Sequence, residues 1–313
     1  MNLLFIALGL FLLVIGGNWL LKAAVGLSLK LNIPKIVIGM TVVSFATSAP
    51  ELIVSVKSAL IGATGLAVGN VIGSNIANLG LVLGITVIIS KIDVEKSFYK
   101  TDWPVMMMAS LLLFGFVVYD ETISSTEGVI MLVALIAFLI YLLKFQKRTV
   151  VNEIPKDNEE LPLYQVVLFL AIGGFSLWAG SELLIKGAIA LADSFGISER
   201  IIGITIVSIG TSIPELSASI IAVIKKEKAI SLGNLIGSNV FNILAVLGIT
   251  SIITPVKIKQ IDMGLLDIDI FWMLGISFLI LPLVFFPRKL RLDWNDGIIL
   301  LVLYGVFIYT TIN

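Results

Sequence analysis

Two glutamates lie within long apolar segments of the 313-residue chain, Glu51 and Glu215, and a proline directly precedes each of them. A carboxylate at the centre of a membrane helix costs about 2.5–3.5 kcal/mol on insertion scales unless a partner compensates its charge. Each proline also removes the backbone hydrogen bond to the residue four positions earlier, which frees the carbonyl oxygens of Ala46 and Gly210. Buried carboxylates beside freed carbonyl oxygens indicate a bound cation.

Hydroxyl and amide side chains recur at helical spacing around these glutamates. Thr47 precedes Glu51 by four residues, and Thr211 precedes Glu215 by four, so each pair shares one helix face. The next apolar segments carry a polar stripe at i, i+4 and i+8, formed by Asn70, Ser74 and Asn78 and matched by Asn234, Ser238 and Asn242. These oxygens suit Ca²⁺, which takes about six to eight oxygen ligands, and can also hold Na⁺. For the first asparagine of each stripe, a role as a bridge between helices is equally open.

The two motifs occur twice at one offset. Residues 39–51 read GMTVVSFATSAPE and residues 203–215 read GITIVSIGTSIPE, an offset of 215 − 51 = 164. Residues 69–78 read GNVIGSNIAN and residues 233–242 read GNLIGSNVFN, again 164 apart. The small residues spaced as G-x-x-x-G in the second motif predict a close approach between helices. The duplication indicates an internal repeat rather than unrelated anchoring helices.

The composition places these motifs in lipid. Apolar residues make up 58% of the chain and charged residues 13%, against about 45–50% and about 25% in soluble domains. We expect an all-α integral membrane protein with ten spans of about 20 residues each. The predicted spans are residues 2–29, 35–60, 67–90, 103–118, 128–144, 163–192, 201–224, 231–254, 266–286 and 297–310. The first lacks a basic leader and an A-x-A cleavage site, so we expect a retained helix rather than a signal peptide.

A hydrophilic connector divides the chain into two halves. We expect a first five-helix repeat at residues 1–145, a cytoplasmic connector at 146–162 and a second repeat at 163–313. Because five spans precede the second copy, the two copies enter the membrane from opposite sides, as in the inverted repeats of secondary transporters. Threading the spans gathers most Lys and Arg residues on the connector's face, so the positive-inside rule predicts a multi-pass cell-membrane protein with both termini extracellular.

The paired motifs resemble those of the sodium/calcium exchanger family of the cation/Ca²⁺ antiporter superfamily, and the resemblance spans both halves, as in a compact prokaryotic member. It implies that Glu51 and Glu215 are shared ligands of Ca²⁺ and Na⁺ and that Thr47 and Thr211 help coordinate Ca²⁺. The central positions fall to Asn78 and Asn242, and the flanking Na⁺ sites to the side chains of Ser48, Ser74, Ser212 and Ser238 with the backbone oxygens of Ser44 and Ser208.

Some relatives, including potassium-dependent exchangers, carry an aspartate where this chain has Asn242. Two carboxylates then remain, enough to balance one Ca²⁺, and we expect no potassium requirement. The predicted activity is electrogenic Na⁺/Ca²⁺ antiport by alternating access. The alternative is a H⁺/Ca²⁺ or other divalent cation exchanger, although relatives of that kind carry an acid where this chain has Gly73 and Gly237.

Other classes of function find less support. The chain has no Cys and no His, which excludes thiolate or imidazole metal sites and the Ser/His and zinc types of intramembrane protease. There is no G-x-x-x-x-G-K-S/T phosphate loop, and the formal net charge of zero gives no sign of nucleic-acid binding. We therefore expect no enzyme activity, no cofactor and no obligatory protein partner, with Na⁺, Ca²⁺ and the lipid bilayer as the partners. A channel stays open as an alternative, because a constriction with two carboxylates could also conduct.

Overall fold

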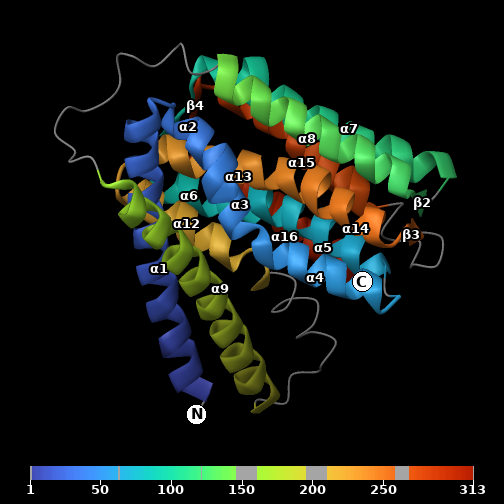
Figure 1. Ribbon diagram of the computed structural model, residues 1–313, viewed down its shortest axis with the longest axis horizontal. Helices are drawn as coiled ribbons and strands as arrows, with labels where there is room; N and C mark the ends of the chain where they lie inside the picture. Colours follow the sequence, from blue (N-terminus) through green and yellow to red (C-terminus); the bar gives the residue numbers. More distant parts are fainter. Residues whose placement is uncertain are drawn as a thin grey trace. The chain divides into compact units, whose positions relative to one another are not determined.

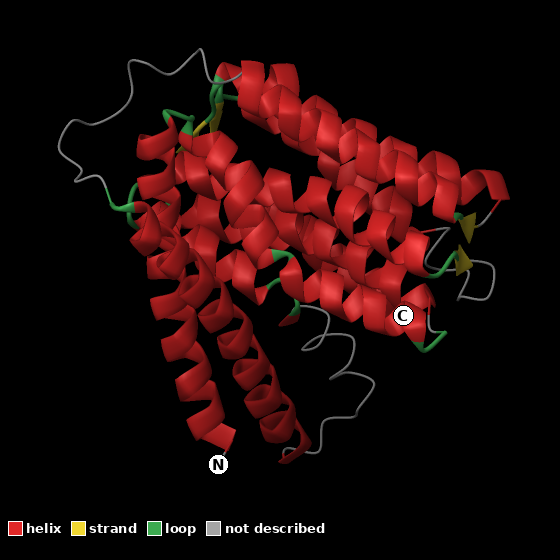
Figure 2. Cartoon of the chain, in the orientation of Figure 1, coloured by secondary structure: helices red, strands yellow, loops and turns green. Residues whose placement is uncertain are grey.

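The computed structural model describes residues 2–62, 64–120, 122–145, 161–194, 210–257 and 268–312. Helices make up nearly all of this part of the chain, with only four two-residue strands (Figure 2). Large apolar side chains are exposed on many helices; Phe11, Phe175 and Phe278 are each about 60% exposed. Apolar surface of this kind suits lipid rather than water. The prediction of an all-α membrane protein is confirmed.

Seven of the described helices are long and apolar enough to cross a membrane: Leu3–Leu31, Thr64–Ile89, Phe98–Val118, Ser125–Lys144, Leu163–Leu191, Lys228–Ile253 and Trp294–Thr311. The interrupted pair Lys35–Thr47 and Ala49–Leu60 would make an eighth span. Two shorter apolar helices, Ile213–Ile224 and Ile270–Phe285, lie in the two other predicted spans. Residues 201–209 lie outside the described part of the chain, so the ten-span inverted repeat stays a prediction.

One compact unit comprises Met1–Thr47 and Leu142–Asn234. Its elements are α1 (Asn2–Leu31), α2 (Lys35–Ile38), the π-helical segment η1 (Gly39–Val43), α3 (Ser44–Thr47), α9 (Leu163–Ser194), α12 (Ile213–Ile224) and the first half of α13 (Lys228–Phe241). The long helices α1 and α9 lie side by side (Figure 1). We call this the first unit.

Four glycines allow the close contact between α1 and α9. A Cβ atom added to Gly9 would lie 2.8 Å from the carbonyl oxygen of Gly180, and one added to Gly16 would lie 2.9 Å from that of Gly173. These distances are shorter than ordinary carbon–oxygen contacts, so only glycine fits, as at other close crossings of membrane helices. Gly9 and Gly173 are 164 residues apart, as are Gly16 and Gly180, so the offset of the motifs extends to this helix pair.

The second unit comprises Ser48–Tyr141 and Leu235–Asn313. Its elements from the first half of the sequence are α4 (Ala49–Leu60), α5 (Thr64–Ala77), η2 (Asn78–Val82), α6 (Leu83–Ile89), β1 (Ile92–Asp93), η3 (Phe98–Asp102), α7 (Trp103–Asp120), β2 (Thr122–Ile123) and most of α8 (Ser125–Phe145). The second half contributes the end of α13, η6 (Asn242–Leu247), α14 (Gly248–Ile253), β3 (Val256–Lys257), α15 (Ile270–Phe285), β4 (Arg291–Leu292) and α16 (Trp294–Ile312). Each compact unit thus combines segments from both halves, and the assignment of 1–145 and 163–313 as repeats stays a prediction from the sequence.

Two short antiparallel ribbons join the halves within the second unit. Strand β1 pairs with β4, and β2 pairs with β3. Strands β1 and β3, one from each pair, show the repeat offset, since Ile92 and Val256 are 164 residues apart. Each ribbon therefore takes one strand from each half of the chain. This exchange of strands is one reason why the compact unit does not follow the division of the sequence.

Candidate ion-binding site

The two predicted helix interruptions have the same local geometry. Ser48, between α3 and α4, has φ −85° and ψ 5°, and Ser212, before α12, has φ −88° and ψ 4°. Both values fall in the bridge region between helix and strand conformations, where many functional residues lie. Glu51 and Glu215 then lie in the first turns of α4 and α12, and both are fully buried. A helix N-terminus stabilises negative charge, so each break places its glutamate where the helix dipole favours a carboxylate.

In the first unit, Asn234 connects three helices around the predicted ligand Thr47. Thr47 Oγ1 donates to Asn234 Oδ1 at 3.2 Å, and Asn234 Nδ2 donates to Ser219 Oγ at 3.2 Å. Ser44 Oγ donates to the Asn234 carbonyl oxygen at 2.9 Å. All four residues are buried. The Asn234 side chain thus bridges α3, α12 and α13, which is the structural role that the sequence had left open.

The equivalent asparagine in the second unit makes the equivalent bond. Asn70 Nδ2 donates to Ser55 Oγ at 3.1 Å and to the carbonyl oxygen of Glu51 at 3.4 Å, so it joins α4 to α5. Ser55 and Ser219 are themselves 164 residues apart. The two motifs do not include this serine pair, although the repeat offset is a signal that could have found it.

Close helix contact holds α13 in place in the first unit. A Cβ atom added to Gly39 would lie 2.6 Å from the carbonyl oxygen of Ile230, and one added to Gly233 would overlap the carbonyl oxygen of Ile36. The prediction that the motif glycine Gly233 permits close approach is confirmed. The contact brings the backbone of α2 and η1 against α13, beside the Thr47–Asn234 hydrogen bond.

The carbonyl oxygen of Gly210, which the proline frees from its helix bond, has a partner. Ser181 Oγ on α9 donates to it at 2.9 Å. This bond occupies one of the two lone pairs of the carbonyl oxygen. The residue equivalent to Ser181 in the other repeat is Gly17, which has no hydroxyl group. The repeats therefore differ at this point, which the motifs alone did not show.

Four asparagines form a buried, doubly symmetric cluster in the second unit. Asn78 Nδ2 donates to Asn239 Oδ1 at 3.1 Å, and Asn242 Nδ2 donates to Asn75 Oδ1, also at 3.1 Å. Asn75 and Asn239 in turn each donate to the other's backbone carbonyl oxygen, at 3.2 and 3.3 Å. No side chain of the four is more than 1% exposed. We call these four residues the asparagine cluster.

The asparagine cluster leaves two acceptor oxygens available. Oδ1 of Asn78 and Oδ1 of Asn242 are buried and accept no hydrogen bond within the described part of the chain. A buried acceptor without a donor costs about 1–3 kcal/mol, and a cation ligated by the oxygen would offset that cost. The sequence predicted Asn78 and Asn242 as ligands but missed Asn75 and Asn239, which fix the orientation of those amides.

Two of the π-helical segments begin at Asn78 and Asn242. Segment η2 starts at Asn78 and η6 starts at Asn242, while η1 lies two helical turns before Glu51. A π-helical turn inserts one residue into the helix repeat and is frequent at functional sites. Here the insertion follows the polar stripe directly, at equivalent positions of the two repeats.

The predicted ligands in the described part of the chain are divided between the two units. Ser44, Thr47, Thr211, Ser212 and Glu215 belong to the first unit, and Ser48, Glu51, Ser74, Asn78, Ser238 and Asn242 belong to the second. All of them are buried except Thr211, which is half-buried. Ser208 lies outside the described residues. Across the described ranges there is no group of three or more His, Cys, Asp or Glu side chains, so an ion bound there must use neutral oxygens as well.

Comparison with known proteins identifies the family of the chain. The family model described as sodium/calcium exchanger protein matches residues 1–144 and 165–313. The putative antiporter CaxA of Alkalimonas amylolytica is 36% identical over 96% of this chain and 95% of its own length. The sodium/calcium exchanger MaX1 of Methanosarcina acetivorans is 28% identical over 98% and 97%.

The solved structures of the sodium-calcium exchanger NCX_Mj are similar over nearly the whole chain. The form soaked with 10 mM Na⁺ and 10 mM Sr²⁺ superposes with a TM-score of 0.83 at 31% identity, covering 98% of this chain and 97% of the other. The members of the matched family and these relatives are described as transporters rather than enzymes. The chain therefore belongs to the sodium/calcium exchanger protein family of multi-pass membrane cation/Ca²⁺ antiporters.

Proposed function

We propose that this protein exchanges Na⁺ for Ca²⁺ across the cell membrane by alternating access, that the exchange is electrogenic, and that it needs no K⁺. The observation that carries the proposal is the repeated burial of a carboxylate at a helix break: Glu51 and Glu215 are fully buried in the first turns of α4 and α12. Intramembrane acids at equivalent positions of a repeat are functional candidates by default.

The proposed ligands are oxygens of several kinds. Glu51 and Glu215 supply the charge, and Asn78 and Asn242 supply buried amide oxygens that accept no hydrogen bond from the described residues. The other ligands are the side chains of Thr47, Thr211, Ser48, Ser212, Ser74 and Ser238 and the backbone oxygens of Ser44 and Ser208. Ligands of this type suit Ca²⁺ and Na⁺ better than Mg²⁺, which demands stricter octahedral geometry.

The charge of the ligands determines how many Na⁺ ions are exchanged for one Ca²⁺. Two carboxylates balance one Ca²⁺, and three Na⁺ on the same ligands would leave about one excess positive charge, worth about 2.3 kcal/mol per 100 mV of membrane potential. Because the amides of Asn78 and Asn242 are neutral, no further carboxylate is available at the central positions to hold K⁺.

The repeat supports alternating access. The motifs, the glycine pairs of α1 and α9 and the asparagine cluster all follow the offset of 164. Alternating access requires bundles that move against one another, and inverted repeats are a recurring source of such bundles. The boundaries between the units fall at Thr47–Ser48, where the helix is interrupted, at Tyr141–Leu142 within α8, and at Asn234–Leu235 within α13.

The decisive experiment is ⁴⁵Ca²⁺ uptake into proteoliposomes preloaded with Na⁺, with K⁺ or with a proton gradient. Uptake that needs internal Na⁺ supports the proposal. Uptake driven by the proton gradient without Na⁺ would instead identify a H⁺/Ca²⁺ exchanger. Uptake independent of any opposing ion would identify a channel.

A further inference from the structure

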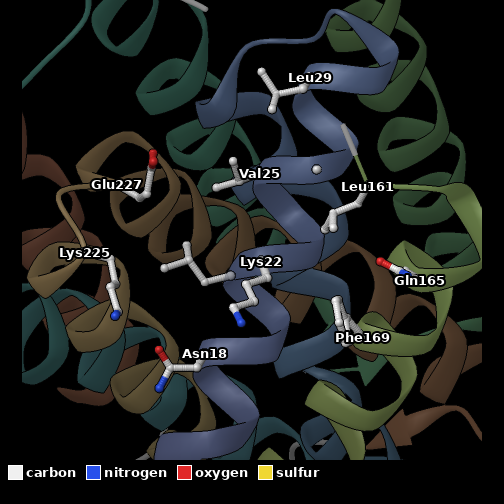
Figure 3. A pocket seen from close by; sticks show the side chains of 11 residues that line it. Asn18, Lys22, Val25, Leu29, Leu161, Gln165, Phe169, Lys225 and Glu227 are labelled. Carbon is white, nitrogen blue, oxygen red and sulfur yellow. The ribbon is translucent and has the colours of Figure 1, made fainter. Parts of the chain in front are cut away.

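A cavity of about 470 Å³ lies within the first unit, apart from every predicted ion ligand. Its wall from α1 is a single helix face, formed by Asn18, Lys22, Val25 and Leu29 at steps of three and four residues. The start of α9 supplies Gln165 and Phe169, and the turn after α12 supplies Lys225 and Glu227 (Figure 3).

Asn18 and the two lysines of the lining lie at one end of the cavity, and the rest of the lining is mainly apolar apart from Gln165 and Glu227, which lies beside Val25 in Figure 3. In Figure 3 the polar ends of Asn18, Lys22 and Lys225 lie together, and the α1 face continues through Val25 to Leu29 at the far end. Leu21, Leu161 and Phe169 extend the apolar lining. An occupant must therefore combine a polar group with an apolar portion.

The charge of the lining is positive. Glu227 is the acidic residue in the lining, but Lys35 holds its carboxylate with Nζ–Oε distances of 2.7 and 2.9 Å. Lys35 thus neutralises Glu227. Lys22 and Lys225 have no acidic partner in the described part of the chain, so two positive charges are left to face an occupant.

We propose that this cavity binds an anionic phospholipid, with the headgroup phosphate at Lys22 and Lys225 and an acyl chain along Val25, Leu29 and Phe169. Basic pockets between membrane helices are a known way of holding anionic headgroups. The apolar wall favours a lipid over a free phosphate ion, because a phosphate ion would make no favourable contact with Val25, Leu29 and Phe169. The proposed site is independent of ion exchange and would stand if the coupling ion proved to be H⁺.

The test is native mass spectrometry of the purified, delipidated protein titrated with dioleoyl phosphatidylglycerol or dioleoyl phosphatidylcholine, each with and without excess inorganic phosphate. We expect tighter binding of the anionic lipid. Each lysine near an anionic group contributes about a fivefold change, so K22Q/K225Q should weaken binding about thirtyfold. The charge-matched control K57Q/K289Q removes two exposed lysines outside the lining and should bind as the wild type does.

K22R/K225R keeps both charges and should restore binding, which separates loss of charge from loss of fold. Equal affinity for the two lipids, or K22Q/K225Q and K57Q/K289Q behaving alike, would overturn the site. Displacement of the lipid by inorganic phosphate alone would overturn the lipid assignment and leave a soluble-anion site in its place.

Discussion

Asn78 donates a hydrogen bond from Nδ2 to Oδ1 of Asn239 at 3.1 Å, and both side chains are fully buried. Because Nδ2 of the Asn78 amide points to Asn239, the acceptor oxygen Oδ1 of the same amide faces away from Asn239. The same relation joins Asn242 to Asn75. The predicted ligand oxygen of Asn78, in the first half of the chain, is thus oriented by Asn239 in the second half. The predicted ligand oxygen of Asn242, in the second half, is oriented by Asn75 in the first half.

Removing that support should weaken ion binding without removing a ligand. We expect Asn239→Ala and Asn75→Ala each to raise the Ca²⁺ concentration for half-maximal uptake by about 10–100-fold, the usual effect of losing an outer-shell partner of a metal ligand. The measurement is ⁴⁵Ca²⁺ uptake at graded Ca²⁺, with thermal unfolding as a check of the fold. Unchanged half-maximal concentrations in both variants would show that the asparagine cluster only packs helices together.

The buried carboxylates should be indispensable. Glu51→Gln and Glu215→Gln keep the side-chain shape but remove the charge, so we expect Ca²⁺ uptake to fall by more than about 100-fold, beyond the range of outer-shell losses. Both proteins should still insert and purify. Glu182→Gln is the matched control, because Glu182 is an exposed acid on α9, 3.8 Å from Lys186. Near-normal uptake in either buried variant would move the ion site elsewhere.

The sequence predicted candidate ligands, but not the residues that hold those candidates in place. Type and spacing single out Glu51 and Glu215 as candidate ligands, because an acid after a proline in an apolar segment is costly without a partner. Spacing of i, i+4 and i+8 assumed an uninterrupted α-helix, whereas π-helical turns begin at Asn78 and Asn242. The hydrogen bond from Ser181 to Gly210, and those made by Asn75 and Asn239, depend on contacts between distant segments that no local pattern encodes.

The glycines between α1 and α9 should tolerate no side chain. Gly16→Ala would place a Cβ atom 2.8 Å from the backbone nitrogen of Leu177, and overpacking of this kind costs about 1–3 kcal/mol. Gly115→Ala is the control, since a Cβ atom there would meet nothing within 4 Å. Thermal unfolding in detergent should show a lower midpoint for Gly16→Ala and an equal or higher one for Gly115→Ala. Equal midpoints in the two variants would contradict the close crossing.

Topology can be tested because the chain has no native cysteine. We expect Asn2→Cys and Asn313→Cys to react with an impermeant thiol reagent in intact cells, since the positive-inside rule places both termini outside. Lys156→Cys, in the connector, should react only after permeabilisation. A terminal cysteine protected in intact cells but labelled after permeabilisation would reverse the assignment.

The last prediction concerns charge movement. If three Na⁺ leave for each Ca²⁺ that enters, one net positive charge moves outward per cycle, and its energy changes by about 2.3 kcal/mol per 100 mV. Ca²⁺ uptake into Na⁺-loaded proteoliposomes should therefore accelerate at an inside-positive potential and slow at an inside-negative one, and should proceed in K⁺-free medium. Asn242→Asp adds a carboxylate at a position that is fully buried and already presents an acceptor oxygen, so it should change the cation preference. Asn234→Asp is the comparison variant, because both polar atoms of the Asn234 amide already have a hydrogen bond, Oδ1 with Thr47 and Nδ2 with Ser219. Uptake that ignores the potential would reject three-to-one exchange, and a strict K⁺ requirement in the wild type would show that two carboxylates suffice to use K⁺.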